Sequence, residues 1–381
     1  MMGFTDLQFI WWVLIGAVLI IYAATAGFDF GATMLLPFMR KESDRRVILN
    51  ASGRTWDGNQ TWIVFAGGGL FVIWPAVYAA TFSGLYAAIL IILWSFFLRP
   101  PGFDFRAKID SHIWRRFWDL GLFVSAFFPM LIFGVAFGNL LQGLPLSFSP
   151  ISLRSFYHGN FWGLINWMGI IAGVVAILMA LMHGAAMLNR RTEGDLKRRM
   201  QRLFYIFGVL LLIVFTGGGF MVAYAVKGYV LVHSPANATL HPLSSVVTRQ
   251  TGAWFASYAQ YPWKAAAPIV AYIGIVLAMI TLKLGKGAFA FWMSVVAIAG
   301  VVATAGTALF PFIVPSSFAP AQSMTVWNAT SAQYTLNAML YVTIPLLAFI
   351  LCYKIFAYWA VWRGKGTLDS KDVAANEHEY Y

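Results

Sequence analysis

Repeated apolar runs of about 20 residues constrain this chain more than any other feature of its sequence. A helix needs about 20 mostly apolar residues to cross the hydrocarbon core of a bilayer. Charged residues make up 10% of the chain, whereas ordinary soluble domains carry about 25%. An outer-membrane barrel would instead read as short segments of alternating polarity. The sequence therefore predicts an all-α polytopic membrane protein.

Nine apolar runs are close to the length of a membrane-spanning helix. They cover residues 7–35, 56–79, 82–98, 118–142, 162–188, 203–226, 265–282, 288–310 and 334–360. We expect residues 1–360 to form a single integral membrane domain and residues 361–381 to form a cytoplasmic tail.

Basic residues alternate along the predicted connections. All but four of the 26 Lys and Arg residues lie in or beside every second connection, and the exceptions are Arg154, Lys227, Arg249 and Lys264. Because basic loops stay in the cytoplasm, this pattern predicts an N-terminus outside the membrane and a cytoplasmic C-terminus. Membrane topology thus accounts for the net charge of +12, and no nucleic-acid partner is expected.

Glycine-rich segments suggest an internal repeat. Residues 31–35 resemble residues 184–188, and the triplets 67–69 and 217–219 follow at similar offsets. Parallel repeats of this kind occur in membrane proteins. We expect two four-helix bundles, at about 7–142 and 162–310, and one extra peripheral helix at about 334–360. The alternative is that glycine-rich membrane helices look alike because small residues allow close packing.

Four carboxyl groups are predicted near the cytoplasmic ends of the spans, namely Asp29, Asp57, Asp104 and Asp119. Carboxyls in such positions are candidates for a proton path. Asp57 and Asp119 are also predicted in first helical turns, where the helix dipole stabilises an anion. Asp104 has a simpler explanation in an ion pair with Arg106. Asp29 lies near a helix C-terminus, where the dipole disfavours it, so it is the strongest functional candidate.

Helical spacing divides the polar start of the second run into two faces. Asp57, Gln60 and Thr61 share one side, and Asn59 and Trp62 share another. Trp62 is interpreted either as an anchor at the membrane interface or as a ring packed against small residues.

Ligands for a redox cofactor are scarce in this chain. Among six histidines, only His183 falls clearly inside a predicted span, and we expect it to form an interhelical hydrogen bond. The single cysteine, Cys352, excludes an intrachain disulfide and a Cys-ligated cluster. The sequence predicts no metal site and no pair of axial haem ligands.

Several blocks of the sequence resemble a known family. They read AGFDFG from residue 26, WDGNQTW from 56, RPPGFDFR from 99, VAFGNLLQG from 135, FPF from 310 and WNATS from 327. Together they resemble subunit II of cytochrome bd quinol oxidases over nearly the whole chain. The resemblance implies two four-helix bundles with a peripheral helix, paired with a similarly built subunit I.

The resemblance also implies a function. Such a complex is a terminal oxidase of the bacterial inner membrane, which oxidises quinol and reduces oxygen to water with cytoplasmic protons. Two b-type haems and one d-type haem are ligated by subunit I. Subunit II is a scaffold and is expected to contribute oxygen access and a proton path. A quinone occupies subunit II in some members, and a small accessory subunit is a further expected partner.

Carried over by position, Asp57 matches a proposed proton-entry aspartate and Trp62 matches a tryptophan at the mouth of the oxygen route. Asp29 matches the acidic residue of its block. Two departures are Ala26, where members often have an aspartate, and Thr61, where an apolar residue is usual.

A proton-coupled transporter is the alternative from another class, since it too would carry a repeat and intramembrane carboxyls. It would be expected to show broken helices and charges at the midplane, whereas the carboxyls here are predicted at one face.

Overall fold

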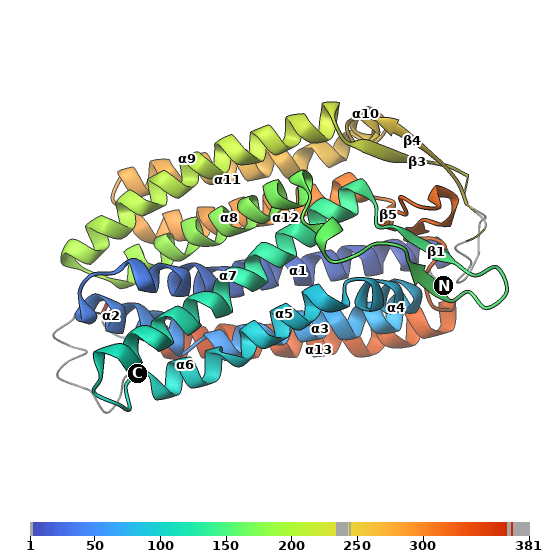
Figure 1. Ribbon diagram of the computed structural model, residues 1–381. Helices are drawn as coiled ribbons and strands as arrows, with labels where there is room; N and C mark the ends of the chain where they lie inside the picture. The colour runs from blue at the N-terminus through green and yellow to red at the C-terminus, as the bar shows by residue number, and fades with distance from the viewer. Residues whose placement is uncertain (1–2, 234–242, 244, 364–366, 369–381) are drawn as a thin grey trace.

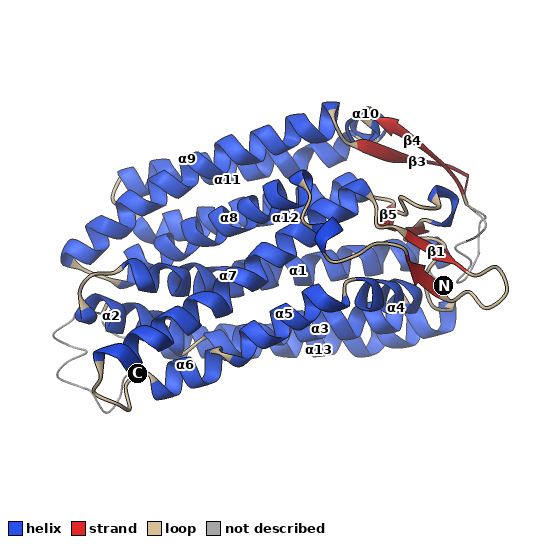
Figure 2. Ribbon diagram, in the orientation of Figure 1, coloured by secondary structure: helices blue, strands red, loops and turns tan. Residues whose placement is uncertain are grey.

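The computed structural model describes residues 3–233, 243, 245–363 and 367–368 of the 381-residue chain. Long helices lie side by side, and short strands gather at one end of the molecule (Figures 1 and 2). Within the described residues, eight helices are long and apolar enough to cross a membrane, and a bent pair is a ninth candidate. The prediction of a polytopic helical membrane protein is confirmed.

The long helices are close to the predicted runs. They are α1 (Phe4–Leu35), α3 (Trp56–Ile73), α5 (Tyr86–Phe97), α7 (His112–Gln142), α8 (Trp167–Arg191), α9 (Gly194–Tyr224), α11 (Ala266–Lys283), α12 (Gly287–Leu309) and α13 (Gln333–Trp362). The shorter helices are η1 (Leu36–Phe38), α2 (Glu42–Gly53), α4 (Pro75–Gly84), α6 (Arg99–Phe105), η2 (Trp162–Leu164), α10 (Ala253–Gln260), η3 (Pro262–Ala265) and η4 (Pro320–Gln322).

Three antiparallel hairpins fill the connections at the end of the bundle that carries the N-terminus (Figure 2). They pair β1 (Leu146–Phe148) with β2 (Ser155–Tyr157), β3 (Lys227–His233) with β4 (Val246–Thr251), and β5 (Phe312–Val314) with β6 (Met324–Thr325).

The predicted run at 56–79 is not one straight helix, and this prediction is wrong in detail. α3 ends at Ile73, and α4 starts at Pro75 after a bend of 120°. Pro75 cannot donate a backbone hydrogen bond, and proline disfavours the helical conformation of the residue before it. Trp74 accordingly has φ −126° and ψ 70°. The next helix therefore begins at Tyr86 rather than at residue 82.

The predicted run at 118–142 begins earlier, because α7 starts at His112. Ser111 caps this helix by accepting a hydrogen bond from the backbone N–H of Trp114 at 3.4 Å. The remaining long helices begin and end within about nine residues of the predicted bounds. The predicted tail at 361–381 lies mostly outside the described residues.

Helix α1 lies in the middle of the bundle and packs against α3, α7, α8 and α12. Its closest approach is to α8, where glycines allow the backbones to touch. A Cβ atom built on Gly31 would lie 1.9 Å from the carbonyl oxygen of Ala180. A Cβ on Gly184 would lie 2.5 Å from the backbone of Gly31. Small residues at this crossing hold the two helices together.

Gly31 and Gly184 are matched positions of the predicted repeat, and they meet each other across the α1–α8 contact. Such a contact is what a two-fold relation between two bundles would produce. Helices α9 and α11 lie along one side of the molecule, and α3, α5 and α13 lie along the other (Figure 1). The repeat itself stays a prediction.

Substitution of Gly31 by alanine is expected to lower the stability of the folded chain by about 1–3 kcal/mol, because α1 and α8 must separate to admit the methyl group. The thermal unfolding midpoint in detergent measures the effect. Gly16→Ala is the matched control on the same helix, since nothing lies within 4 Å of its built Cβ. Equal midpoints for the two variants would contradict the close contact.

The two ends of the bundle differ in charge. The connections at the end marked by α2 and α6 carry most of the basic residues, and the hairpins lie at the opposite end (Figure 1). This separation agrees with the alternation in the sequence. We refer to the end with α2 and α6 as the basic end; its assignment to the cytoplasm stays a prediction.

Candidate functional site

The first turns of α3 have two different faces at the basic end. Asn59, Trp62 and Ala66 are buried, whereas Asp57 and Thr61 are exposed on the surface of this chain. Gln60 lies between them and accepts a hydrogen bond from the hydroxyl of Tyr22 at 3.1 Å. The prediction that Asp57 and Trp62 occupy different sides is confirmed, as is the position of Asp57 in the first turn of α3.

Asp29 is completely buried on α1, and its hydrogen-bond donors come from α3 and from Thr55, which directly precedes that helix. The hydroxyl of Thr55 donates to Oδ1 of Asp29 at 3.1 Å, and the amide of Asn59 donates to Oδ2. The same amide also donates to the carbonyl oxygen of Thr25 at 3.0 Å. Both carboxyl oxygens therefore accept hydrogen bonds, as buried polar atoms in proteins usually do.

Helix α13 closes this site from a third direction. The hydroxyl of Tyr358 donates to Oδ1 of Asn59 at 2.6 Å, and the ammonium group of Lys354 donates to the carbonyl oxygen of Gly58. Lys354 also interacts electrostatically with both Asp57 and Asp29. The positive charge of Lys354 therefore acts on both the exposed and the buried carboxyl, whereas the sequence had suggested only a role in membrane topology.

Arg99 is the second residue that sequence reasoning missed. It was counted as a loop charge, yet its side chain is completely buried at the start of α6. Its guanidinium lies over the rings of Phe30, Trp56 and Phe103, at 4.7, 5.3 and 5.8 Å from their centroids. None of its side-chain nitrogens has a hydrogen-bond partner in the described part of the chain. Its electrostatic partner is Asp29.

The signal for Arg99 lay in its sequence context. It stands between the apolar helix α5 and the pair Pro100-Pro101, in a block shared with the resembling family. A charge count cannot separate such an arginine from a solvated loop arginine.

We use the name Asp29 site for Asp29, Thr55, Asn59, Arg99, Lys354 and Tyr358.

Asp119 does not belong to the Asp29 site. It is buried and ion-paired to Arg106 at 2.6 Å and to Arg45 at 3.0 Å. Arg106 also pairs with Glu42 at 2.8 Å. The predicted place of Asp119 in a first helical turn is wrong, because α7 begins seven residues earlier. The ion pairs with Arg45 on α2 and with Arg106, which follows α6, compensate the burial of Asp119, so no stabilisation by the helix dipole is needed.

The charges of this ion-pair cluster reinforce one another. Partial burial opposes the charged form of Glu42, but the hydrogen bond and positive charge of Arg106 outweigh it and lower the pKa of Glu42. Burial likewise opposes the charge of Arg106, yet Asp119 and Glu42 raise its pKa. The ion pairs among Glu42, Arg45, Arg106 and Asp119 tie α2, α7 and the end of α6 together.

Asp104 is exposed on α6, and its predicted pairing with Arg106 is wrong, since Arg106 binds Asp119 and Glu42 instead. Of the four carboxyls, Asp57 and Asp29 share the influence of the positive charge of Lys354, whereas Asp119 pairs with Arg106 and Arg45. Trp62 is 1% exposed and faces the interior of this chain. Its indole N–H has no hydrogen-bond partner among the described residues.

Comparison with known proteins places this chain in a defined family. The family model described as cytochrome bd terminal oxidase subunit II matches residues 7–361. The chain is 41% identical over 383 residues to cytochrome bd-I ubiquinol oxidase subunit 2 of Escherichia coli (strain K12), with full coverage of both chains. This chain belongs to the cytochrome bd terminal oxidase subunit II family.

Other similarities agree with this assignment. A probable cytochrome oxidase subunit 2 of Haemophilus influenzae is 39% identical with full coverage of both chains. Cytochrome bd ubiquinol oxidase subunit 2 of Bacillus subtilis is 28% identical over 357 residues, which is 93% of this chain and 95% of that one. A chain from the structure of bd oxidase from Geobacillus thermodenitrificans matches with a TM-score of 0.72 at 12% identity, covering 94% of this chain and 100% of that chain. The family decides against the transporter alternative.

Bd oxidases carry haems, so we asked whether His183 fits a haem ligand. Its Nδ1 lies 2.7 Å from the hydroxyl of Ser294, and its Nε2 lies 2.9 Å from the carbonyl oxygen of Ala24. Both nitrogens are thereby used, and the predicted interhelical hydrogen bond is confirmed. His183 does not fit an iron ligand. Within the described ranges, no group of three His, Cys, Asp or Glu side chains is arranged to hold a metal ion.

An apolar cavity of about 700 Å³ lies mainly between α1, α7, α8, α9, α11 and α12. Its polar groups include the hydroxyls of Thr216 and Tyr272, which are 2.8 Å apart. Its size is in the range of small-molecule sites in proteins. This cavity could not be predicted from the sequence, because its lining residues come from helices far apart in the chain.

Proposed function

We propose that this subunit of a cytochrome bd terminal oxidase helps to carry protons to oxygen reduction through the Asp29 site. The complex would oxidise quinol, as the name of the Escherichia coli relative states for that protein. Two b-type haems and one d-type haem would be held by subunit I, and this chain would act as its scaffold. The complex would lie in the bacterial inner membrane, with the N-terminus periplasmic, the C-terminus cytoplasmic and a small accessory subunit as a further partner.

The observation that carries this proposal is a buried carboxyl group, Asp29, held by hydrogen bonds from Thr55 and Asn59 at the start of α3. Asp57 is exposed at the basic end, Lys354 interacts with both aspartates, and Asp29 lies inside. Ionisable residues inside a membrane domain are costly and commonly serve proton or ion transfer. Arg99 and Lys354 both bring positive charge to this carboxylate.

In this mechanism, each residue has a distinct task. Asp57 collects protons at the basic end, and Asp29 accepts and releases them at a carboxylate oxygen. Thr55 and Asn59 hold the two oxygens of Asp29 in place, while Tyr358 fixes the amide of Asn59. The haem supplies the oxygen-reducing chemistry when subunit I is present.

Exchange of Asp57 for asparagine is expected to reduce quinol-oxidase turnover at least about threefold, or ~0.7 kcal/mol, because the surface carboxyl that collects protons is lost. Oxygen consumption and haem content are measured on the purified complex, and haem content should not change. Asp104→Asn is the matched control, since Asp104 is also exposed at the basic end. Equal turnover in the two variants would remove Asp57 from the path.

Oxygen access is the second proposed contribution of this chain. Trp62 packs in the interior beside the small residues of α3, and its indole N–H makes no hydrogen bond within the described chain. A substitution at Trp62 therefore changes packing volume without removing a hydrogen bond, so an effect on oxygen affinity would report on a route for gas.

The Trp62→Phe variant is expected to change the apparent KM for oxygen at least about twofold, because a smaller ring alters an interior passage. Oxygen consumption is recorded against oxygen concentration with quinol saturating, and the KM for quinol should stay constant. Trp94→Phe on the exposed face of α5 serves as control. If both KM values are unchanged, Trp62 has a packing role only.

The apolar cavity would hold the bound quinone that the family resemblance suggests, because apolar walls with a few hydroxyl groups suit an isoprenoid chain and a polar head. Purification of the chain from native membranes tests the whole assignment. A coloured complex with a larger haem-bearing partner, and quinone in its lipid extract, is the expected result. A colourless chain without a partner would contradict it.

A further inference from the structure

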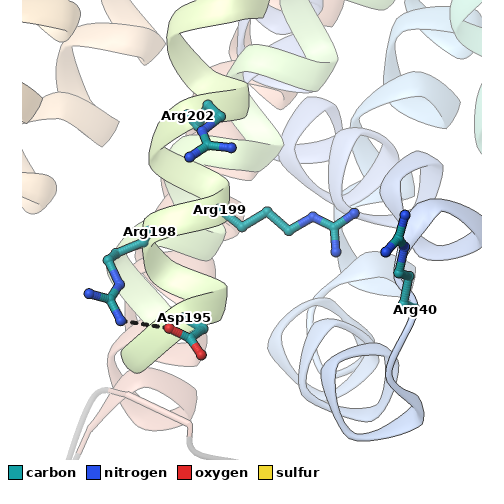
Figure 3. Close-up of a pocket in the computed structure, with 5 residues that line it drawn as sticks. All are labelled: Arg40, Asp195, Arg198, Arg199 and Arg202. Carbon is teal, nitrogen blue, oxygen red and sulfur yellow. Dashed lines mark hydrogen bonds and ion pairs between the residues drawn. The ribbon is translucent and has the colours of Figure 1, made fainter.

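Four arginines surround an open pocket of about 520 Å³ at the basic end, on the side of α9 (Figure 3). Arg198, Arg199 and Arg202 stand on the first turns of α9, and Arg40 comes from the connection between η1 and α2. Asp195 is the one acidic residue of the lining. It pairs with Arg198 at 2.6 Å, on the far side from Arg40.

The other three arginines are left without a carboxylate partner in the described structure. Arg199 extends toward Arg40, so two guanidinium groups face each other across the pocket (Figure 3). Arg199 donates to the carbonyl oxygen of Phe38 at 2.9 Å, which fixes it in this direction. Like charges held together repel, and an anion between them removes that repulsion. The planar donor groups of arginine match the oxygens of a phosphate group.

The surface next to these charges identifies the kind of anion. Arg202 is the last charged residue of α9, and residues 203–224 contain none. Ile206, Val209 and Ile213 follow Arg202 at i+4, i+7 and i+11 and are 46%, 44% and 61% exposed. They form an apolar stripe on the face of α9 that carries Arg202, and the stripe begins one turn after this arginine. Phe38, beside Arg40, is 62% exposed as well.

We propose that Arg40, Arg199 and Arg202 bind the phosphodiester headgroup of an anionic phospholipid, whose acyl chain lies along the stripe on α9. Basic pockets between membrane helices are suited to such headgroups, and each arginine adds to the attraction. A free phosphate ion would use the arginines but would leave the apolar stripe uncovered. The proposal does not depend on the Asp29 site.

The test uses the delipidated complex in detergent and native mass spectrometry. Cardiolipin, phosphatidylglycerol, phosphatidylethanolamine and inorganic phosphate are titrated in parallel. Half-saturation by the two anionic lipids is expected at a concentration at least tenfold lower than for phosphatidylethanolamine. Excess inorganic phosphate is expected not to displace them. Displacement by phosphate at equal concentration, or equal binding of all three lipids, would overturn the proposal.

Variants locate the site. Arg40→Gln with Arg202→Gln is expected to weaken anionic-lipid binding at least tenfold, and this pair keeps the contact from Arg199 to Phe38. Addition of Arg199→Gln should weaken it further. The matched control is Lys108→Gln with Arg116→Gln, which removes the same charge from an exposed position before α7 and one in its first turns. An equal loss in the control would show attraction to the whole basic end and would contradict a defined site.

Discussion

Replacement of Asp119 by asparagine is expected to lower the free energy of unfolding by about 3–5 kcal/mol, because it leaves buried arginines without their shared anion. Arg106 and Asp119 are each 3% exposed in their side chains, and Arg45 is 11% exposed. Glu42 can compensate only in part, since it binds Arg106 from a partly exposed position. Chemical unfolding of the purified complex in detergent measures the loss.

Asp110→Asn is the control for this change. Asp110 pairs with Arg115 at 2.8 Å, but its side chain is 93% exposed. Exposed pairs contribute about 0–1 kcal/mol, so its unfolding curve should stay close to that of the wild type. If Asp119→Asn unfolds like the control but loses turnover per intact complex, the ion-pair interpretation is wrong and Asp119 returns as a proton-path residue.

The second large effect is expected at the Asp29 site. Asp29→Asn should lower turnover at least tenfold, or ~1.4 kcal/mol, because the side chain can no longer accept a proton. The new amide would also oppose the donor of Asn59 that now binds Oδ2. Oxygen consumption per haem is the measurement, with haem content checked by absorption spectroscopy.

Asp29→Glu separates charge from structure in this experiment. It keeps a carboxyl between Thr55 and Asn59, and it should recover part of the turnover that asparagine loses. A structural role alone would make both variants unstable without a difference in turnover per intact complex. Turnover of Asp29→Asn at the wild-type level would contradict the proposed role.

The fold was predictable because its signals are local. Apolar runs and alternating basic connections identify spans without knowledge of any tertiary contact. The same signals failed at two places. The apolar run at 56–79 continues through the break between α3 and α4 at Trp74 and Pro75, and α7 begins at His112, before its apolar part. The hairpins in the connections carry no comparable pattern, since each strand is only two to seven residues long.

Only those features of the candidate site that depend on positions along a single helix could be predicted from the sequence. Spacing separated Asp57 from Trp62, and helix position singled out Asp29. The decisive contacts join distant parts of the chain: Asn59 to Tyr358, and Asp119 to Arg45. Arg99 is the clearest example of a contact that the sequence does not reveal. Its charge predicts a solvent-exposed loop position, whereas in the structure aromatic rings bury its guanidinium group. Cation–π contacts of this kind depend on tertiary structure.

Proton uptake during oxygen reduction tests the central claim most directly. A pH-indicator dye follows uptake when the fully reduced complex reacts with oxygen, in the wild type and in Asp29→Asn. We expect proton uptake to slow at least tenfold in the variant, in step with its turnover, while haem content is unchanged. Uptake at the wild-type rate in Asp29→Asn would contradict a path through the Asp29 site.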